Sequence, residues 1–264
     1  MPTLDRDGVA IHYEVHGRGR ERPPLLLTHG FGATVAMWQK NLPALAADGT
    51  VVAWDLRGHG TSDSPTDPAC YTPAACLADM VAILDACGIE HAALGGHSLG
   101  GYLSLAFHAH HPERTAALVL CSTGPGYKRD DGRAQWNRDI NAMADAIERD
   151  GLSALGGSPE VTGGHRDPDG LVRAARGILV QQDSAVIDHL PDIDVPTLVL
   201  VGDRDRRFRA GADHLATRIP GAEKVVLADA GHAPNIDHPD AFGQTVLQFL
   251  DQPNLREPGA TNHA

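Results

Sequence analysis

The chain has 264 residues, of which 42% are hydrophobic and 21% charged, a composition that excludes a largely disordered protein. The formal net charge is −12, and an acidic surface repels phosphate, so nucleic-acid binding is not expected. Four scattered cysteines without a C-x-x-C pair indicate free thiols rather than disulfides or a zinc site. Without a signal peptide or an apolar run of membrane length, a cytoplasmic protein with no membrane contact is expected.

Short apolar segments alternate with helical segments over the first 121 residues. The predicted strands are residues 9–15, 25–28, 51–54, 92–95 and 116–121. The predicted helices are residues 35–47, 72–88 and 102–110. Strands and helices in this alternation predict an α/β fold with a parallel sheet and crossover helices.

The alternation stops between residues 122 and 191. Helical stretches are expected there at residues 133–149, 169–181 and 184–190. Seventy residues without a strand are too many for a simple loop, so a helical insertion is expected. Its first helix places four apolar side chains on one face, and packing against residues 171–180 is the alternative to covering a substrate site. These side chains are Trp136, Ile140, Met143 and Ile147.

The alternation resumes after the insertion. Strands are expected at residues 197–201 and 225–227, and helices at 210–218 and 240–250. Residues 252–264 are polar, with proline and glycine, and predict a flexible tail. The expected organisation is therefore a core of residues 1–121 and 192–251, a helical cap of residues 122–191, and the tail.

Residues 96–100, Gly-His-Ser-Leu-Gly, fit the pattern G-x-S-x-G between a predicted strand and a predicted helix. In that context a tight turn holds the serine in a strained backbone and lifts its hydroxyl above the sheet. Gly96 and Gly100 supply the small neighbours that the turn requires, and the helix start adds N–H donors. Ser98 is therefore expected to be a nucleophile; a surface serine in a glycine-rich turn is the alternative.

A serine nucleophile needs a base and a carboxylate that orients the base. Active sites of such sheets lie beyond the carboxyl ends of the strands, and His232 follows the strand at residues 225–227. The turn after residues 197–201 offers Asp203 and Asp205, and spacing alone leaves both open. Other histidines lie within backbone-determined turns or at the far end of the helix after Ser98. They are His29, His97, His108, His110 and His111.

Five segments together resemble the motif series of the α/β-hydrolase fold superfamily. They are residues 28–32, 55–62, 96–101, 202–205 and 230–232, and the order Ser…Asp…His also agrees. The resemblance spans about residues 9 to 250. It implies a mostly parallel central sheet flanked by helices, with residues 122–191 as a helical cap that sets specificity.

The resemblance also implies site residues. The last aspartate of the family's G-x-x-D turn is usually the triad acid, which selects Asp205. The oxyanion hole is implied to be the backbone N–H groups of Phe31 and Leu99, which suit a tetrahedral oxyanion because they are preorganised. Trp38 and Trp136 are candidates for lining a substrate pocket, with core packing as an equal alternative.

The expected function is hydrolysis of a small carboxylic ester or lactone through an acyl-enzyme, with a small-molecule substrate and neither cofactor nor metal. The motifs also resemble those of serine-type cofactor-free haloperoxidases, enol-lactonases and carbon–carbon bond hydrolases. The alternatives are therefore a carbon–carbon bond hydrolase, a lyase or an acyltransferase on the same scaffold, or a ligand receptor without turnover. Fold alone does not decide among them, and the oligomeric state is left open.

Overall fold

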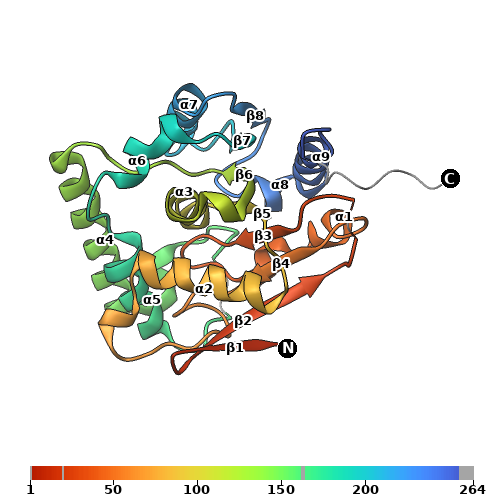
Figure 1. Ribbon diagram of the computed structural model, residues 1–264. Helices are drawn as coiled ribbons and strands as arrows, with labels where there is room; N and C mark the ends of the chain where they lie inside the picture. Colours follow the sequence, from red (N-terminus) through yellow and green to blue (C-terminus); the bar gives the residue numbers. More distant parts are fainter. Residues whose placement is uncertain (1, 20, 162–163, 256–264) are drawn as a thin grey trace.

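The computed structural model describes residues 2–19, 21–161 and 164–255. Its centre is an eight-stranded sheet in the order β1-β2-β4-β3-β5-β6-β7-β8 (Figure 1). β1 and β2 pair antiparallel, as do β2 and β4, whereas the pairs from β4 to β8 are parallel. The strands are β1 (Thr3–Arg6), β2 (Val9–His16), β3 (Leu25–Thr28), β4 (Val51–Trp54), β5 (Ala92–His97), β6 (Thr115–Cys121), β7 (Thr197–Gly202) and β8 (Glu223–Leu227).

The expected α/β architecture is confirmed, and each predicted strand is present. β1 is an additional strand that the sequence analysis missed, because its alternately exposed residues carry no apolar run. The helices are α1 (Leu42–Leu45), α2 (Pro73–Ala86), α3 (Leu99–His110), α4 (Asp130–Asp150), α5 (Pro168–Ala174), α6 (Ala185–His189), α7 (Arg209–Arg218), α8 (Pro234–Asp237) and α9 (Pro239–Leu250). In the described residues, no helix combines the length and apolarity needed to cross a membrane.

Alternate residues of the buried strands face two separate hydrophobic cores. In β3, Leu26 belongs to the core that includes side chains of α2, α3 and α7, whereas Leu25 and Leu27 belong to the core that includes those of α1 and α9. A strand covered on both faces needs apolar residues at successive positions, which explains the continuous apolar runs. The two layers of helices leave the carboxyl edge of the sheet free for loops that carry function.

Two predicted helices differ from those observed. The segment 35–47 forms a 3₁₀ turn at Val35–Trp38 and the separate short helix α1. Pro43 lies in the first turn of α1, where its missing N–H and its ring prevent a continuous helix. The segment 169–181 forms α5 and then a π-helical turn at Ala175–Leu179, after which Val180 is extended.

Residues 122–191 contain helices and no strand among those described, as the sequence analysis expected. The apolar face of α4 does not lie mainly over the substrate site. Ile140 and Ile147 pack against Val172 and Ala175, which belong to the neighbouring helical turns, while Trp136 lies only partly buried at the edge of this cluster. The alternative of packing against residues 171–180 therefore holds for Ile140 and Ile147, because α5 and the π-helical turn lie against them, whereas Trp136 stays available to line a cavity. Figure 1 shows α4 and α5 together at the side opposite α9.

Of the predicted tail, residues 252–255 are described, and residues 256–264 lie outside the described residues. Leu255 is 7% exposed and belongs to the core that contains α9. The chain therefore remains attached to the core at least to this residue.

The turn between β5 and α3 predicts the effect of two glycine substitutions. A Cβ atom added at Gly96 would lie 2.2 Å from the carbonyl carbon of Gly100, whereas one added at Gly243 in α9 would meet nothing within 4 Å. We expect Gly96→Ala to lower the free energy of unfolding by about 1–3 kcal/mol, as overpacking does. Gly243→Ala, the matched control, should be neutral or stabilise by up to about 1 kcal/mol. Urea unfolding of both variants checks this, and equal effects would contradict it.

Candidate active site

Ser98 occupies the turn that joins β5 to α3, at φ 52° and ψ −113°. A non-glycine residue at positive φ is strained, and neighbouring hydrogen bonds hold it there. Its N–H donates to the Cys121 carbonyl at 2.9 Å, and its carbonyl accepts from the Thr123 hydroxyl at 2.6 Å. Cys121 is the last residue of β6 and Thr123 lies two residues beyond it, so the adjacent strand holds the serine at the carboxyl edge of the sheet.

His232 and Asp205 meet beyond the same edge. His232 Nδ1 lies 2.8 Å from Asp205 Oδ2, and the second oxygen of Asp205 accepts the Phe208 N–H at 3.2 Å. Burial alone would raise the pKa of Asp205, but these hydrogen bonds and the electrostatic interaction with His232 outweigh it and lower the pKa below its ordinary value. Asp205 is therefore an ionised carboxylate next to the imidazole. Asp203, which spacing left open, does not contact His232.

Two residues that the sequence analysis did not assign to the site surround His232. The ring of Phe208 stacks on that of His232, with centroids 4.7 Å apart and planes 21° apart. His97 donates from Nε2 to the His232 carbonyl at 2.8 Å. Burial and the neighbouring His232 lower the pKa of His97 to about 3, so it is neutral and can carry its single proton on this nitrogen. The position of His97 beside Ser98 was the available signal.

The two backbone N–H groups implied for an oxyanion hole belong to two turns at this edge. Leu99 is the first residue of α3, where a helix leaves its N–H groups without intrahelical partners. Phe31 lies in the turn after β3, where Gly30 passes so close to His97 that an added Cβ would lie 2.6 Å from the ring. Neither N–H donates to another group among the described residues.

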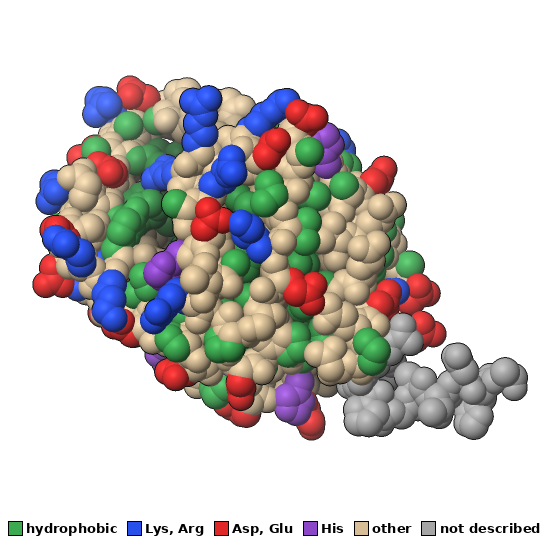
Figure 2. All heavy atoms as spheres, turned by 90° about the horizontal axis from the view of Figure 1, so that it is seen from above, with side chains coloured by type: hydrophobic (Ala, Val, Ile, Leu, Met, Phe, Trp, Pro, Cys, Tyr) green, Lys and Arg blue, Asp and Glu red, His purple; other side chains and the backbone are tan. Residues whose placement is uncertain are grey.

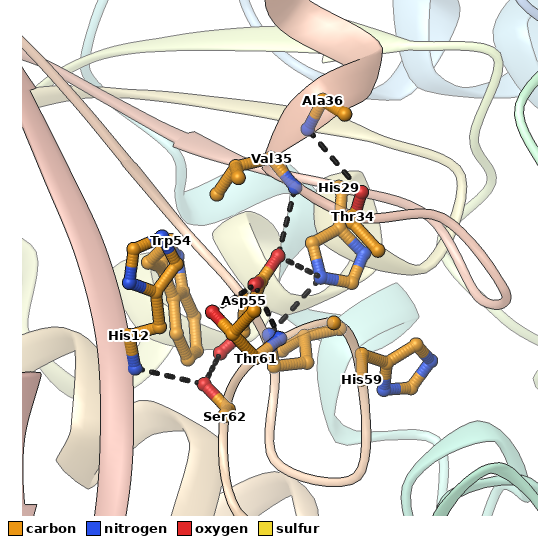
Figure 3. A network of polar contacts seen from close by, with 12 residues as sticks. His12, His29, Thr34, Val35, Ala36, Trp54, Asp55, His59, Thr61 and Ser62 are labelled. Atoms are coloured by element: carbon orange, nitrogen blue, oxygen red, sulfur yellow. Dashed lines mark hydrogen bonds and ion pairs between the residues drawn. The ribbon is translucent and has the colours of Figure 1, made fainter. Parts of the chain in front are cut away.

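A buried polar network fixes the turn that carries Phe31 (Figure 3). Asp55, at the end of β4, accepts from the backbone N–H groups of Val35 at 2.8 Å and Thr61 at 2.9 Å. His29 Nδ1 donates to the Gly30 carbonyl at 2.7 Å, and its Nε2 accepts the Leu56 N–H at 3.0 Å. These bonds require neutral His29, and burial lowers its pKa to about 4 in spite of the nearby Asp55.

A cavity of about 470 Å³ opens onto Ser98 and Leu99. Its wall includes Trp136 of α4 and Phe208. Trp136 is oriented by a hydrogen bond from its indole N–H to the Leu179 carbonyl at 2.9 Å. Figure 2, a view from above, shows a hollow with hydrophobic side chains in it and several Lys and Arg side chains around it.

The structure contradicts the expectation that Trp38 lines the pocket. Trp38 is 1% exposed and packs in the core beside Phe242, with ring centroids 6.1 Å apart. It lies on the face of the sheet covered by α1 and α9, whereas the cavity is beyond the sheet edge. Its position in the 3₁₀ turn after the Phe31 turn directs it inward, which spacing in the sequence does not reveal.

The arrangement matches a known family. A family model described as alpha/beta hydrolase fold matches residues 23–239. The chain is 27% identical to 3-oxoadipate enol-lactonase 2 of Acinetobacter baylyi over 96% of this chain and 97% of that protein. It is 30% identical to a protein of Stutzerimonas stutzeri that is named as a carbamate hydrolase, RutD, over 91% of this chain and 96% of that protein. The enol-lactonase structure from Burkholderia xenovorans LB400 superimposes with TM-score 0.75 at 29% identity, covering 95% of this chain and all of that one.

The buried histidines predict the pH dependence of stability. The pKa of His29 is about 4 when folded, against about 6.5 for an unfolded histidine. Between these values the unfolded chain binds more protons, so the free energy of unfolding should fall as the pH decreases from about 6.5 toward 4. The slope contributed by His29 approaches about 1.4 kcal/mol per pH unit. Urea unfolding at pH 7.5, 6 and 5 measures it.

His29→Gln should flatten this curve, whereas His91→Gln, at an exposed histidine, should leave its shape unchanged. A free energy of unfolding that stays constant between pH 7.5 and 5 in the wild type would contradict the expectation.

Proposed function

From the premise that the chain belongs to the alpha/beta hydrolase fold family, we propose that it is a serine hydrolase of small carboxylic esters or lactones. The observation that carries the proposal is the 2.8 Å contact between His232 and the ionised Asp205, at the sheet edge where Ser98 stands on its strained turn. A nucleophile, a base and an orienting carboxylate are the groups that acyl transfer requires.

In the proposed first half-reaction, Ser98 Oγ attacks the carbonyl carbon while His232 Nε2 takes the hydroxyl proton. Asp205 accepts the Nδ1–H of His232, which fixes the tautomer and stabilises the imidazolium. The oxyanion accepts hydrogen bonds from the N–H groups of Phe31 and Leu99. The bond to the leaving oxygen then breaks, that oxygen takes the proton from His232, and an acyl-enzyme remains.

In the second half-reaction, water replaces the alcohol. His232 removes a proton from the water as its oxygen adds to the acyl carbon. The bond to Ser98 Oγ breaks, the proton returns to that oxygen, and the carboxylic acid leaves. Each proton that His232 takes is therefore returned within the same half-reaction, and no group outside the site is needed.

The choice of ester or lactone rests on the cavity and on the relatives. Apolar and aromatic side chains in the wall of the cavity at Ser98 suit the carbon skeleton of a small ester or lactone around the reacting carbonyl. Two similar proteins are named enol-lactonases. A thermophilic esterase from Thermogutta terrifontis superimposes with TM-score 0.79 at 28% identity.

Replacement of the nucleophile tests the proposal directly. We expect Ser98→Ala to remain folded and to lose at least roughly 10³-fold in kcat on 4-nitrophenyl acyl esters, because the oxyanion donors cannot replace the nucleophile. Ser153→Ala, at an exposed serine of the cap, should retain wild-type turnover. Labelling by a fluorophosphonate, located by peptide mass spectrometry, should be at Ser98. Near-normal turnover of the Ser98→Ala variant would rule out the serine mechanism.

The two aspartates of one turn provide a matched comparison. Asp205→Asn removes the charge beside His232 and favours the wrong tautomer, so a loss of kcat of up to about 10⁴-fold is expected. Asp203→Asn makes the same change two residues away, without contact to His232, and should have a much smaller effect. Steady-state kinetics of both variants measures this. Equal losses, or a larger loss for Asp203→Asn, would show that the orienting carboxylate is misassigned.

A further inference from the structure

Arg207 lines the cavity but has no role in the proposed hydrolytic steps. It follows the orienting Asp205 by two residues and lines the same cavity as Ser98. Its guanidinium carbon lies 5.0 Å from the ring centroid of Trp136 and 5.8 Å from that of Phe208. The guanidinium therefore lies near both Trp136 of α4 and Phe208, the residue whose ring stacks on His232.

The other cations of the cavity wall are neutralised by nearby carboxylates. Lys128 Nζ lies 2.8 Å from Asp188, and Arg129 forms a two-pronged pair with Asp131 at 2.6 and 3.0 Å. Within the described part of the chain, Arg207 has neither a hydrogen bond nor a carboxylate within 4.0 Å. An uncompensated positive charge at this cavity contrasts with the net charge of −12 of the whole chain.

The aromatic contacts of Arg207 also leave its binding groups available. Stacking on an aromatic ring engages the face of the guanidinium plane, whereas its N–H donors point outward in the plane. Those donors match the two oxygens of a carboxylate. Trp136 is itself fixed by its bond to the Leu179 carbonyl, and the ring of Phe208 by its stacking on that of His232. The exposed side chain of Arg207 thus contacts two oriented rings, and these contacts reduce the entropy lost on binding an anion.

We propose that Arg207 is a specificity-determining residue that binds a carboxylate of the substrate, so that the preferred substrate is an ester or lactone carrying a second, ionised carboxyl group. This inference rests on the proposed serine hydrolysis and narrows its substrate class. A single unpaired guanidinium provides one two-pronged site and one compensating charge, which fits a monoanion. Because the chain as a whole carries a net charge of −12, a local positive charge at the cavity favours both the approach and the binding of an anionic substrate.

The test uses 4-nitrophenyl esters in matched pairs. The anionic members are mono(4-nitrophenyl) esters of dicarboxylic acids with five to eight carbons, and the neutral partners are 4-nitrophenyl esters of monocarboxylic acids of equal length. A second pair, 4-carboxyphenyl and phenyl butanoate, carries the charge on the leaving group. The measured quantity is the ratio of kcat/KM for the anionic ester to that for its neutral partner.

In the wild type we expect at least one pair to favour the anionic ester. Arg207→Gln should lower that ratio about tenfold, mainly through KM, because the contact is made in both ground and transition states. Added salt should lower the ratio of the wild type and not that of the variant. Arg207→Lys should give an intermediate ratio, since the charge remains and the planar donor pair is lost.

Arg206→Gln is the control, because Arg206 is exposed as Arg207 is and carries the same charge, but it does not line the cavity. It should leave the ratio unchanged. The proposal is overturned if no pair favours the anion, or if Arg207→Gln lowers both esters of every pair by the same factor, as loss of stacking on Trp136 alone would do. Ser98→Ala in the same assays separates the two proposals. Turnover that survives Ser98→Ala overturns the hydrolase mechanism. If Ser98→Ala abolishes turnover but Arg207→Gln leaves the ratio unchanged, only the role of Arg207 is overturned.

Discussion

The site depends on the close packing of three backbone segments at the carboxyl edge of the sheet: the end of β3, the turn after β5 and the start of α3. At the turn after β5, a Cβ atom on Gly100 would lie 2.1 Å from the carbonyl oxygen of Thr28 at the end of β3. Only a residue without a side chain allows α3 to begin this close to the neighbouring strand. That approach places Ser98, the N–H of Leu99 and the turn that carries Phe31 side by side. The strain at Ser98 is tolerated because its N–H and carbonyl are held by hydrogen bonds to Cys121 and Thr123.

Buried titratable groups at this edge differ in their protonation state. His29 and His97 are fully buried and neutral, with pKa values near 4 and 3, and each uses its proton to hold a backbone carbonyl. Asp205 is the buried carboxylate that keeps its charge, because His232 and a backbone N–H donate to it. Neutral histidines thus orient backbone, whereas the ionised Asp205 faces the imidazole that would become cationic in the proposed reaction.

The helical segment of residues 122–191 is connected to the rest of the chain by polar and aromatic contacts. His165, from this segment, accepts the Gly60 N–H at 3.0 Å and donates to the Gly32 carbonyl at 3.1 Å, so it bridges two turns outside the segment. Arg207 likewise lies against Trp136 of this segment. Residues that line the cavity therefore come from both parts of the chain, and His165 links the same two parts through the turns at Gly32 and Gly60.

The sequence by itself determined the alternation of strands and helices, the strand-to-helix turn at Ser98 and the histidine after the last strand. These follow from local rules: apolar runs for buried strands, glycines where backbones approach, and the meeting of parallel strands at one edge. The tertiary structure decided that Asp205, the aspartate that the resemblance selected, contacts His232, that Trp38 belongs to the core, and that part of the apolar face of α4 packs on α5. It also decided that Lys128 pairs with Asp188, while Arg207 has no carboxylate partner among the described residues. These outcomes depend on distances between residues far apart in the chain, which no periodicity encodes.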